Sequence, residues 1–88
     1  MRLKLTEAQK KRVLKTPPYP NRLREAMKEA GVTQEQVAEW LGVTQVQVSR
    51  LVRGEHPRLP LATARRLSRL FQLRIDDLFP SRDEAVAS

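Results

Sequence analysis

The sequence predicts an all-α protein in which a basic N-terminal extension precedes a bundle of five short helices. Apolar residues recur three and four positions apart in several segments, as they do in helices that bury one side. Helix-capping residues flank these segments, with threonine, asparagine or proline before them and glycine after several of them. No segment alternates polar and apolar residues as a half-buried strand does. The 88 residues have the length of one small domain.

The charge of the chain favours a polyanionic partner. It has 17 Lys and Arg residues against 10 Asp and Glu residues, a formal net charge of +7, which suits DNA, RNA or an acidic lipid surface. There is no cysteine and only one histidine, so we expect no disulfide, no metal site and no cofactor. The sequence has neither a signal-peptide pattern nor an apolar stretch long enough to span a membrane, so we expect a cytoplasmic protein without a membrane partner.

Residues 1–20 are expected to form a basic arm and a proline-rich linker, with six basic residues and one acidic residue. A short helix could start at Thr6, although a helix this short is marginal in water on its own. Its apolar side would be thin, consisting of Leu5, Ala8, Gln9 and Val13. Two interpretations remain open: a solvated, partly ordered extension, or an arm that contacts DNA or a second subunit. The prolines after Thr16 mark the boundary with a domain at residues 21–80, and residues 81–88 are expected to be a flexible tail.

The domain is predicted to begin with a helix from Arg22 to Ala30. Asn21 is a favoured N-cap residue, and Gly31 supplies the left-handed conformation that ends many helices. The apolar positions of this helix recur at helical spacing and form its buried stripe: Leu23, Ala26, Met27 and Ala30.

Two short helices joined at Gly42 form the centre of the chain, TQEQVAEWLG followed by VTQVQVSRLVRG. Each opens with a threonine that is followed three residues later by a glutamine, which is the pattern of a capping box. Gly42 and Gly54 lie where the two helices would end, in a conformation that glycine adopts at low cost. The predicted helices run from Gln34 to Leu41 and from Gln45 to Arg53. Their buried residues are predicted to be Val37, Ala38, Leu41, Val48, Leu51 and Val52.

Two further helices are predicted after a loop at residues 54–60. The single histidine, His56, lies in this loop, and no neighbouring pattern gives it a catalytic role. The fourth helix begins near Pro60, and its apolar stripe consists of Leu61, Ala64, Leu67, Leu70 and Phe71. A last short helix is stopped by Pro80. Its apolar residues could belong to the core or to a dimer interface: Leu73, Ile75, Leu78 and Phe79.

The span from about Arg22 to Phe79 resembles the Cro and phage-repressor type of helix-turn-helix domain. The resemblance rests on four segments that cover about two thirds of the chain: NRLREAMKEAG, VTQEQVAEWLGVTQVQVSRLVRG, TARRLSRLFQL and IDDLF. It implies a five-helix repressor-type bundle that binds double-stranded DNA. It also implies a nucleoid-associated transcriptional regulator, most simply a repressor, that binds a pseudopalindromic operator as a homodimer.

The second central helix is the candidate for base recognition in the major groove. When its apolar residues face the core, its polar and basic side chains face outward, and none of them is acidic. Glutamine can pair with adenine, arginine can pair with guanine, and valine can meet a thymine methyl group. By the resemblance, Gln45, Val46 and Arg50 contact bases, whereas Gln47 and Ser49 contact either bases or phosphate.

Five further residues are candidates for contacts with the DNA backbone. In similar domains the position of Gln34 holds a phosphate with help from the helix dipole, and Thr44 opens the next helix in the same way. Arg53, Arg58 and Arg22 could flank the site as phosphate contacts. Alternatively, Gln34 and Thr44 only cap helices, and Arg53 and Arg58 are solvated surface residues.

Two positions depart from the family pattern. Many of these domains bury an arginine–glutamate pair where this sequence has Met27 and Val52, which we predict to touch in the core. Trp40 stands where a polar residue is usual on the outer side of its helix. We expect it either to be partly buried under Tyr19 and the proline segment or to contact a second subunit or another protein.

Other functional classes compete with a regulator. The main alternative is an antitoxin that binds a protein toxin and regulates its own operon, with residues 1–20 as the extension that meets the toxin. A third class is a factor that contacts the transcription machinery through the same bundle. An enzyme is not expected, because there is no glycine-rich phosphate loop, no nucleophile with a base and no paired acids.

Overall fold

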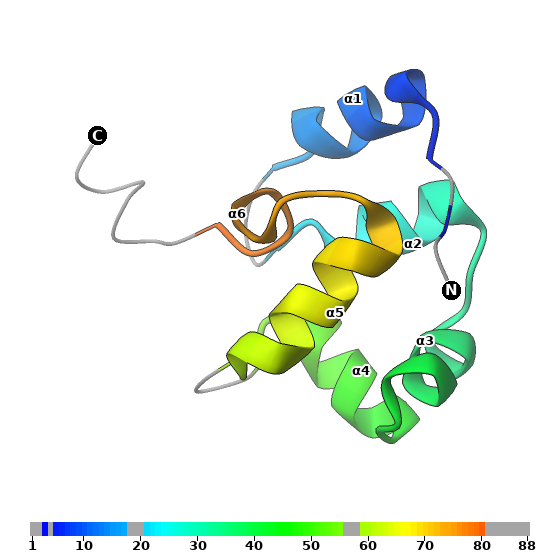
Figure 1. Ribbon diagram of the computed structural model, residues 1–88, viewed down its shortest axis with the longest axis vertical. Helices are drawn as coiled ribbons and strands as arrows, with labels where there is room; N and C mark the ends of the chain where they lie inside the picture. Colours follow the sequence, from blue (N-terminus) through cyan, green and yellow to red (C-terminus); the bar gives the residue numbers. More distant parts are fainter. Residues whose placement is uncertain (1–2, 4, 18–20, 56–58, 81–88) are drawn as a thin grey trace.

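Six helices follow one another in the part of the chain that the structure describes (Figure 1). They are α1 (Glu7–Lys15), α2 (Leu23–Ala30), α3 (Gln34–Leu41), α4 (Gln45–Arg53), α5 (Leu61–Phe71) and α6 (Ile75–Leu78). The computed structural model describes residues 3, 5–17, 21–55 and 59–80, and these ranges contain no strand. The predicted all-α fold is therefore confirmed, and α2 to α6 correspond to the five predicted helices.

The two central helices have the predicted bounds because their ends are specified locally. At the start of α3 the Thr33 hydroxyl accepts from the Gln36 backbone N–H (3.1 Å), and the Gln36 side-chain carbonyl accepts from the Thr33 N–H (2.9 Å). The same reciprocal bonds join Thr44 and Gln47 at the start of α4, at 3.2 and 2.9 Å. Between the two helices Gly42 has φ 71°, a left-handed conformation that suits glycine. These bonds satisfy N–H groups that a helix start leaves unpaired.

The core lies where α5 crosses the middle of the bundle, against α2, α3, α4 and α6 (Figure 1). Its largest fully buried side chains are Phe71, Leu23, Leu67, Leu78, Val13, Val37 and Val48. Leu73 and Leu78 are buried in this core, so they do not form the exposed dimer surface that was one of the expectations for the last helix. Met27 and Val52 are also buried in the same cluster, and neither faces solvent.

The packing of α1 differs from the solvated, partly ordered extension that was one expectation for residues 1–16. Val13 is completely buried and Leu5 is 7% exposed, and both belong to the same core cluster as α2 to α6. The Leu3 N–H donates to the Leu70 carbonyl at 2.8 Å, which ties the start of the chain to the end of α5. A short helix is marginal when isolated, but burial of an apolar side against other helices stabilises it. Residues 1–16 therefore contribute to the core of the fold.

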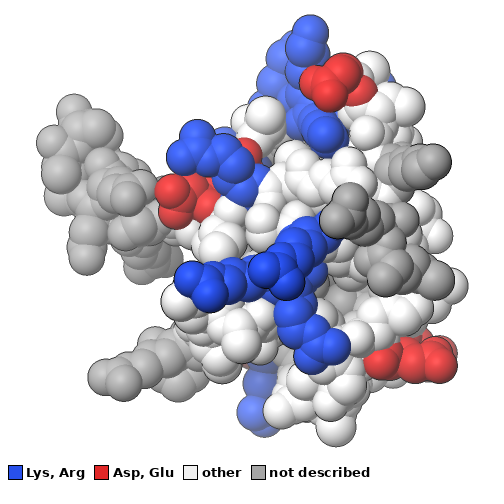
Figure 2. Space-filling model, in the orientation of Figure 1, with Lys and Arg blue, Asp and Glu red and all other residues white. Residues whose placement is uncertain are grey.

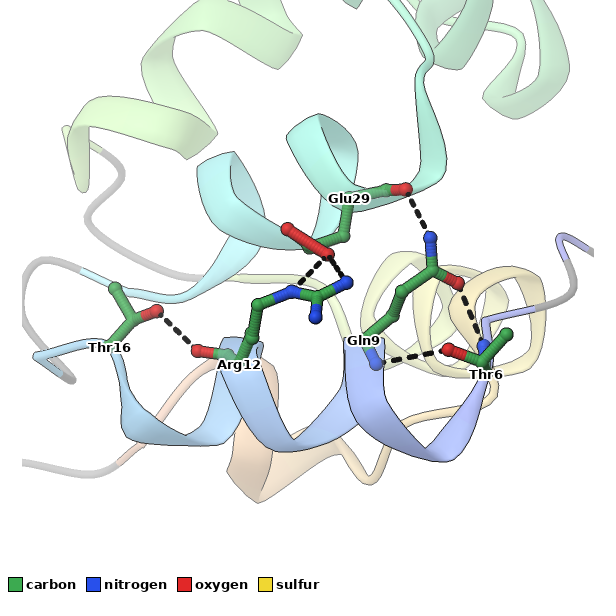
Figure 3. Close-up of polar contacts among 5 residues, drawn as sticks. All are labelled: Thr6, Gln9, Arg12, Thr16 and Glu29. Atoms are coloured by element: carbon green, nitrogen blue, oxygen red, sulfur yellow. Dashed lines mark hydrogen bonds and ion pairs between the residues drawn. The ribbon is translucent and has the colours of Figure 1, made fainter.

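Polar contacts also hold α1 against α2 (Figure 3). The Gln9 side-chain amide donates to the Glu29 backbone carbonyl at 3.0 Å, and its carbonyl accepts from the Thr6 N–H at 2.8 Å. The Arg12 guanidinium donates through Nε and Nη2 to Glu29 Oε1, each at 2.8 Å. In Figure 1 α1 lies at the end of the molecule away from α3 and α4, so it is not placed beside the predicted recognition helix.

Trp40 is partly buried, but the covering element is α5. The Arg66 guanidinium donates to the backbone carbonyls of Leu41 (3.1 Å) and Trp40 (3.3 Å), where it satisfies carbonyl groups at the end of α3. Trp40 lines a groove together with Leu41, Arg66, Arg69 and Leu70. Thr16 and Pro17 line a different hollow, next to the start of α3. The cover expected from the proline segment is therefore not found at these two residues, and Tyr19 lies outside the described residues.

Candidate nucleic-acid interface

Helix α4 presents one apolar side to the core and one polar side to solvent, as predicted. Val48, Leu51 and Val52 are buried, whereas the outward residues are Gln45, Val46, Gln47, Arg50 and Arg53, with Ser49 half-buried. Val46 is 59% exposed, although it is an aliphatic residue on a helix whose other two valines are buried. An exposed aliphatic side chain between polar residues can pack on a thymine methyl group in the major groove. This side of α4 therefore offers donors, an acceptor amide and an apolar contact.

The structure brings three of the candidates together around one surface hollow. Gln34 at the start of α3 lines it together with Ser49 and Arg53 of α4. The other lining residues are Thr16, Pro17, Asn21, Arg24, Glu25, Val52 and Glu55. Gln34 is the first residue of α3, so the positive end of this helix's dipole lies beside the hollow and favours an anion there. The arrangement suits a phosphate group beside a helix that lies in the groove.

Arg24 of α2 is a basic residue at this hollow that the sequence analysis did not single out. Its side chain is exposed, and Leu23, Ala26 and Met27 of the same helix point into the core. The signal was present in the sequence, because the buried stripe of a helix also determines which residues point away from it. The position of α2 relative to α4 was needed to see that this arginine faces the candidate interface.

Arg22 is placed differently from the expectation. Its guanidinium donates to the Thr16 carbonyl at 3.1 Å and to the Asp77 carbonyl at 3.2 Å, and its backbone N–H donates to the Leu78 carbonyl at 2.8 Å. These bonds tie α6 and the N-terminal segment to the start of α2. Because its donors are directed at the protein backbone, we leave Arg22 out of the candidate interface. Arg58 and His56 lie outside the described residues.

Thr44 and Gln47 have the capping role that was the alternative for Thr44. The Gln47 side-chain carbonyl accepts from the Thr44 N–H (2.9 Å) and hydroxyl (3.3 Å), so its acceptor is already engaged. A bidentate contact with adenine needs both the acceptor and the donor of the amide. Gln47 is therefore less suited to base recognition than Gln45, whose side chain is exposed beside it.

Arg53 is held in place before any ligand binds. Its Nη1 donates to the Ser49 hydroxyl at 2.7 Å, and its Nε donates to Glu55 Oε2 at 3.0 Å. The Arg53 and Glu55 side chains are 53% and 60% exposed, so water and salt screen this ion pair strongly. The ion pair with Glu55 orients Arg53 at the edge of the hollow. The Glu55 carboxylate also places a negative charge close to the expected position of the DNA backbone.

Replacing Glu55 by glutamine should strengthen binding to any DNA duplex. The substitution removes a negative charge beside Arg53 and leaves the guanidinium available to a phosphate, so we expect roughly a two- to fivefold lower Kd at low salt. Fluorescence anisotropy with a duplex of random sequence, measured at two salt concentrations, checks this. Glu7→Gln is the matched control, because Glu7 is an exposed acid on α1, at the other end of the molecule. Equal gains from both substitutions would contradict a local effect at Arg53.

Positive charge is not confined to the candidate interface. Figure 2 shows a band of basic side chains over α5 on the front of the molecule. The basic residues of α5 are Arg65, Arg66 and Arg69, and all are exposed. Net charge therefore indicates a polyanionic partner but does not locate the interface. The location comes from the capped start of α3 and from the exposed side of α4.

The part of the chain that the structure describes has neither a cluster of metal ligands nor a membrane-spanning helix. Those residues contain no cluster of three or more His, Cys, Asp or Glu side chains that could hold a metal ion. Their helices are all too short or too polar to cross a membrane. The chemistry on offer at α3 and α4 is hydrogen bonding and charge neutralisation.

Two capped helices joined by a short turn, with the second exposing amide, guanidinium and aliphatic groups, define a helix-turn-helix protein that binds DNA. A family model described as a helix-turn-helix domain matches residues 21–79. The match covers more than half of the chain, so the chain belongs to this helix-turn-helix family. A search of curated proteins and a search of solved structures each gave no match.

Proposed function

We propose that the protein is a sequence-specific transcriptional regulator that inserts α4 into the major groove of DNA. The observation that carries the proposal is the outward side of α4, where Gln45, Val46 and Arg50 are exposed. Among the described residues, the Gln45 and Arg50 side chains have no hydrogen-bond or ion-pair partner. Such groups can be used on base edges without breaking intramolecular bonds.

The remaining contacts are assigned to the DNA backbone. Gln34 and the start of α3 would hold one phosphate, and Ser49, Arg53 and Arg24 would lie along the same strand. Backbone contacts position a protein on the duplex but carry no sequence information directly. Thr44 and Gln47 act mainly by fixing the start of α4.

The simplest activity is repression of a promoter by a homodimer bound to a pseudopalindromic operator in the nucleoid. The antitoxin alternative needs an extension that is free to meet a toxin. Helix α1 is instead packed on α2 through Val13 and the Arg12–Glu29 pair, which favours the regulator. If the protein also binds a protein partner, the groove beside Trp40 is the proposed contact surface.

Selection of bound fragments from random duplex DNA, at a low and a high salt concentration, tests the proposal. We expect a recurrent motif with two-fold symmetry that persists at the higher salt, because base contacts are less salt-dependent than phosphate contacts. A single unrepeated motif would support specific binding by a monomer. Binding that is salt-sensitive and has no motif would overturn the proposal and leave a non-specific DNA-binding protein.

A further inference from the structure

Asn21 connects the start of α2 to the end of α4. Its side-chain amide N–H donates to the Leu51 carbonyl at 2.6 Å, across 30 residues of sequence. Its side-chain carbonyl accepts from the Leu23 N–H at 3.0 Å. Asn21 is only 6% exposed, and it is the only buried polar residue among those that the structure describes. A buried amide in which both groups are bonded is held in one orientation.

This bond is the only hydrogen bond between α4 and another element among the described residues. The other bonds at α4 are local: the Thr44–Gln47 capping box at its start, the Arg53–Ser49 bond along it, and the turn bonds at Gly54 and Glu55. Apart from Asn21, α4 is held to the bundle by its apolar side. Apolar burial is not directional, so it permits small rotations and shifts of a helix that a hydrogen bond resists.

We propose that Asn21 is a positioning residue that sets the orientation of α4 and thereby the discrimination between DNA sequences. Base recognition is sensitive to this orientation, because bidentate hydrogen bonds in the major groove require the side chain to start from a fixed backbone position. Phosphate contacts tolerate small shifts, since a water molecule can bridge a basic side chain and a phosphate oxygen. The inference rests on the proposed function of α4 in base recognition.

The geometry explains why the side chain is an asparagine. The Leu23 N–H needs an acceptor, and the Leu51 carbonyl, which already accepts from the Gly54 N–H, has a second lone pair that can accept from another part of the chain. An amide supplies both the acceptor and this second donor. Aspartate would keep the acceptor at the start of α2, where it is a favoured capping residue, but would turn a carboxylate toward the Leu51 carbonyl. Asn21→Asp therefore preserves the acceptor for the Leu23 N–H and selectively breaks the link to α4.

The test measures the affinity of the 88-residue protein for the duplex obtained by selection and for a scrambled duplex of the same length. Circular dichroism first shows that each variant is folded. Asn21→Asp should lower the ratio of the two affinities by about 10-fold, because it replaces the bond that ties α4 to the start of α2 with a carboxylate oxygen facing the Leu51 carbonyl, which keeps only its turn bond from the Gly54 N–H. The added negative charge weakens binding to both duplexes and cancels in the ratio. If Asn21→Asp does not fold, Asn21→Ser should lower the ratio of the two affinities in the same way, since serine keeps the acceptor for the Leu23 N–H but is too short to reach the Leu51 carbonyl.

A pH series separates positioning from general loss of stability. Burial at this position disfavours the charged form of the introduced carboxyl and so raises its pKa above the ordinary value of about 3.9. Its protonation restores a donor to the Leu51 carbonyl, so the ratio should recover toward the wild-type value as the pH falls from about 7.5 to about 4. The charged residues that line the same hollow are present in both proteins, so dividing by the wild-type ratio at each pH removes their contribution; they are Arg24, Glu25, Arg53 and Glu55.

Val13→Ala is the matched control for stability, because it removes core volume on α1, away from α4. This variant should melt at a lower temperature and keep the wild-type ratio. An unchanged ratio in Asn21→Asp, or an equal drop in Val13→Ala, would overturn the proposal. Failure to select any motif with wild-type protein would instead reject the proposed function itself.

Discussion

A chain that lacks residues 1–16 should unfold with a free energy about 3 kcal/mol lower than the full-length chain. The deletion removes two buried side chains, Leu5 and Val13, and uncovers the side of α2 that α1 protects. Burying a single Val or Leu side chain contributes about 1.5–3 kcal/mol, and the ordering of the removed residues offsets part of the sum. The midpoint of thermal unfolding should fall by roughly 15 °C, measured by circular dichroism.

A double replacement on the exposed side of α1 provides the control. Lys11 and Lys15 are exposed on this helix, so Lys11→Ala with Lys15→Ala removes charge and leaves the buried contacts in place. We expect its free energy of unfolding to stay within about 0.5 kcal/mol of the wild-type value. If the truncated chain melts at the wild-type temperature, the contacts of α1 contribute nothing and residues 21–80 are an independent domain.

The parts of the fold that could be predicted are those that neighbouring residues determine. The bounds of α3 and α4 follow from Thr33 with Gln36, Thr44 with Gln47, and the glycines after each helix. Each of these signals acts within one helical turn, so its outcome does not depend on the rest of the molecule. The buried stripes were predictable for the same reason, because helical spacing determines which side chains share a side.

The packing of α1 could not be predicted because it depends on distant partners. Gln9 and Arg12 reach Glu29 across 20 and 17 residues, and no pattern in residues 1–16 specifies that carbonyl or carboxylate. A short helix starting at Thr6 was expected, and the structure adds the capping box of Thr6 and Gln9. The thin apolar side of this helix gave no sign that Val13 would be completely buried. Contact with α2 supplied the stability that the isolated segment lacks.

The candidate site could likewise be predicted only where local spacing determines it. The outward side of α4 follows from its helical spacing, whereas the assignment of single arginines depends on where other helices lie. Arg22 and Arg24 are two residues apart, yet Arg22 bonds to carbonyls of Thr16 and Asp77 while Arg24 lines the hollow beside α4. The Asn21 bond to Leu51 is a long-range contact of the same kind. Asn21 was expected to be the N-cap residue of a helix that begins at Arg22, but α2 begins at Leu23 and its N-cap residue is Arg22. Asn21 lies one residue earlier and accepts from the Leu23 N–H, and its bond to Leu51 was not expected.

Arg50→Ala should lower affinity for the selected duplex by roughly 10- to 100-fold and relax the preference at one base pair. A good bidentate contact between arginine and guanine contributes about 1–3 kcal/mol of discrimination. The Arg50 side chain makes no hydrogen bond or ion pair to other described residues, so its removal should change the free energy of unfolding by less than about 0.5 kcal/mol. A loss of binding then reports a contact with DNA and not damage to the fold. Repeating the selection with the variant identifies the base pair whose preference is lost.

Arg24→Ala separates base recognition from backbone contact. Arg24 lines the hollow at the start of α3, where the proposed partner is a phosphate, so this substitution should weaken the selected and scrambled duplexes alike. It should also reduce the slope of log K against log salt by about 1, the value expected for one lost phosphate contact. Arg50→Ala should change that slope much less, because its contact releases no phosphate counterion. Identical behaviour of the two variants would show that the division between base and backbone residues on this interface is wrong, even if both arginines contact DNA.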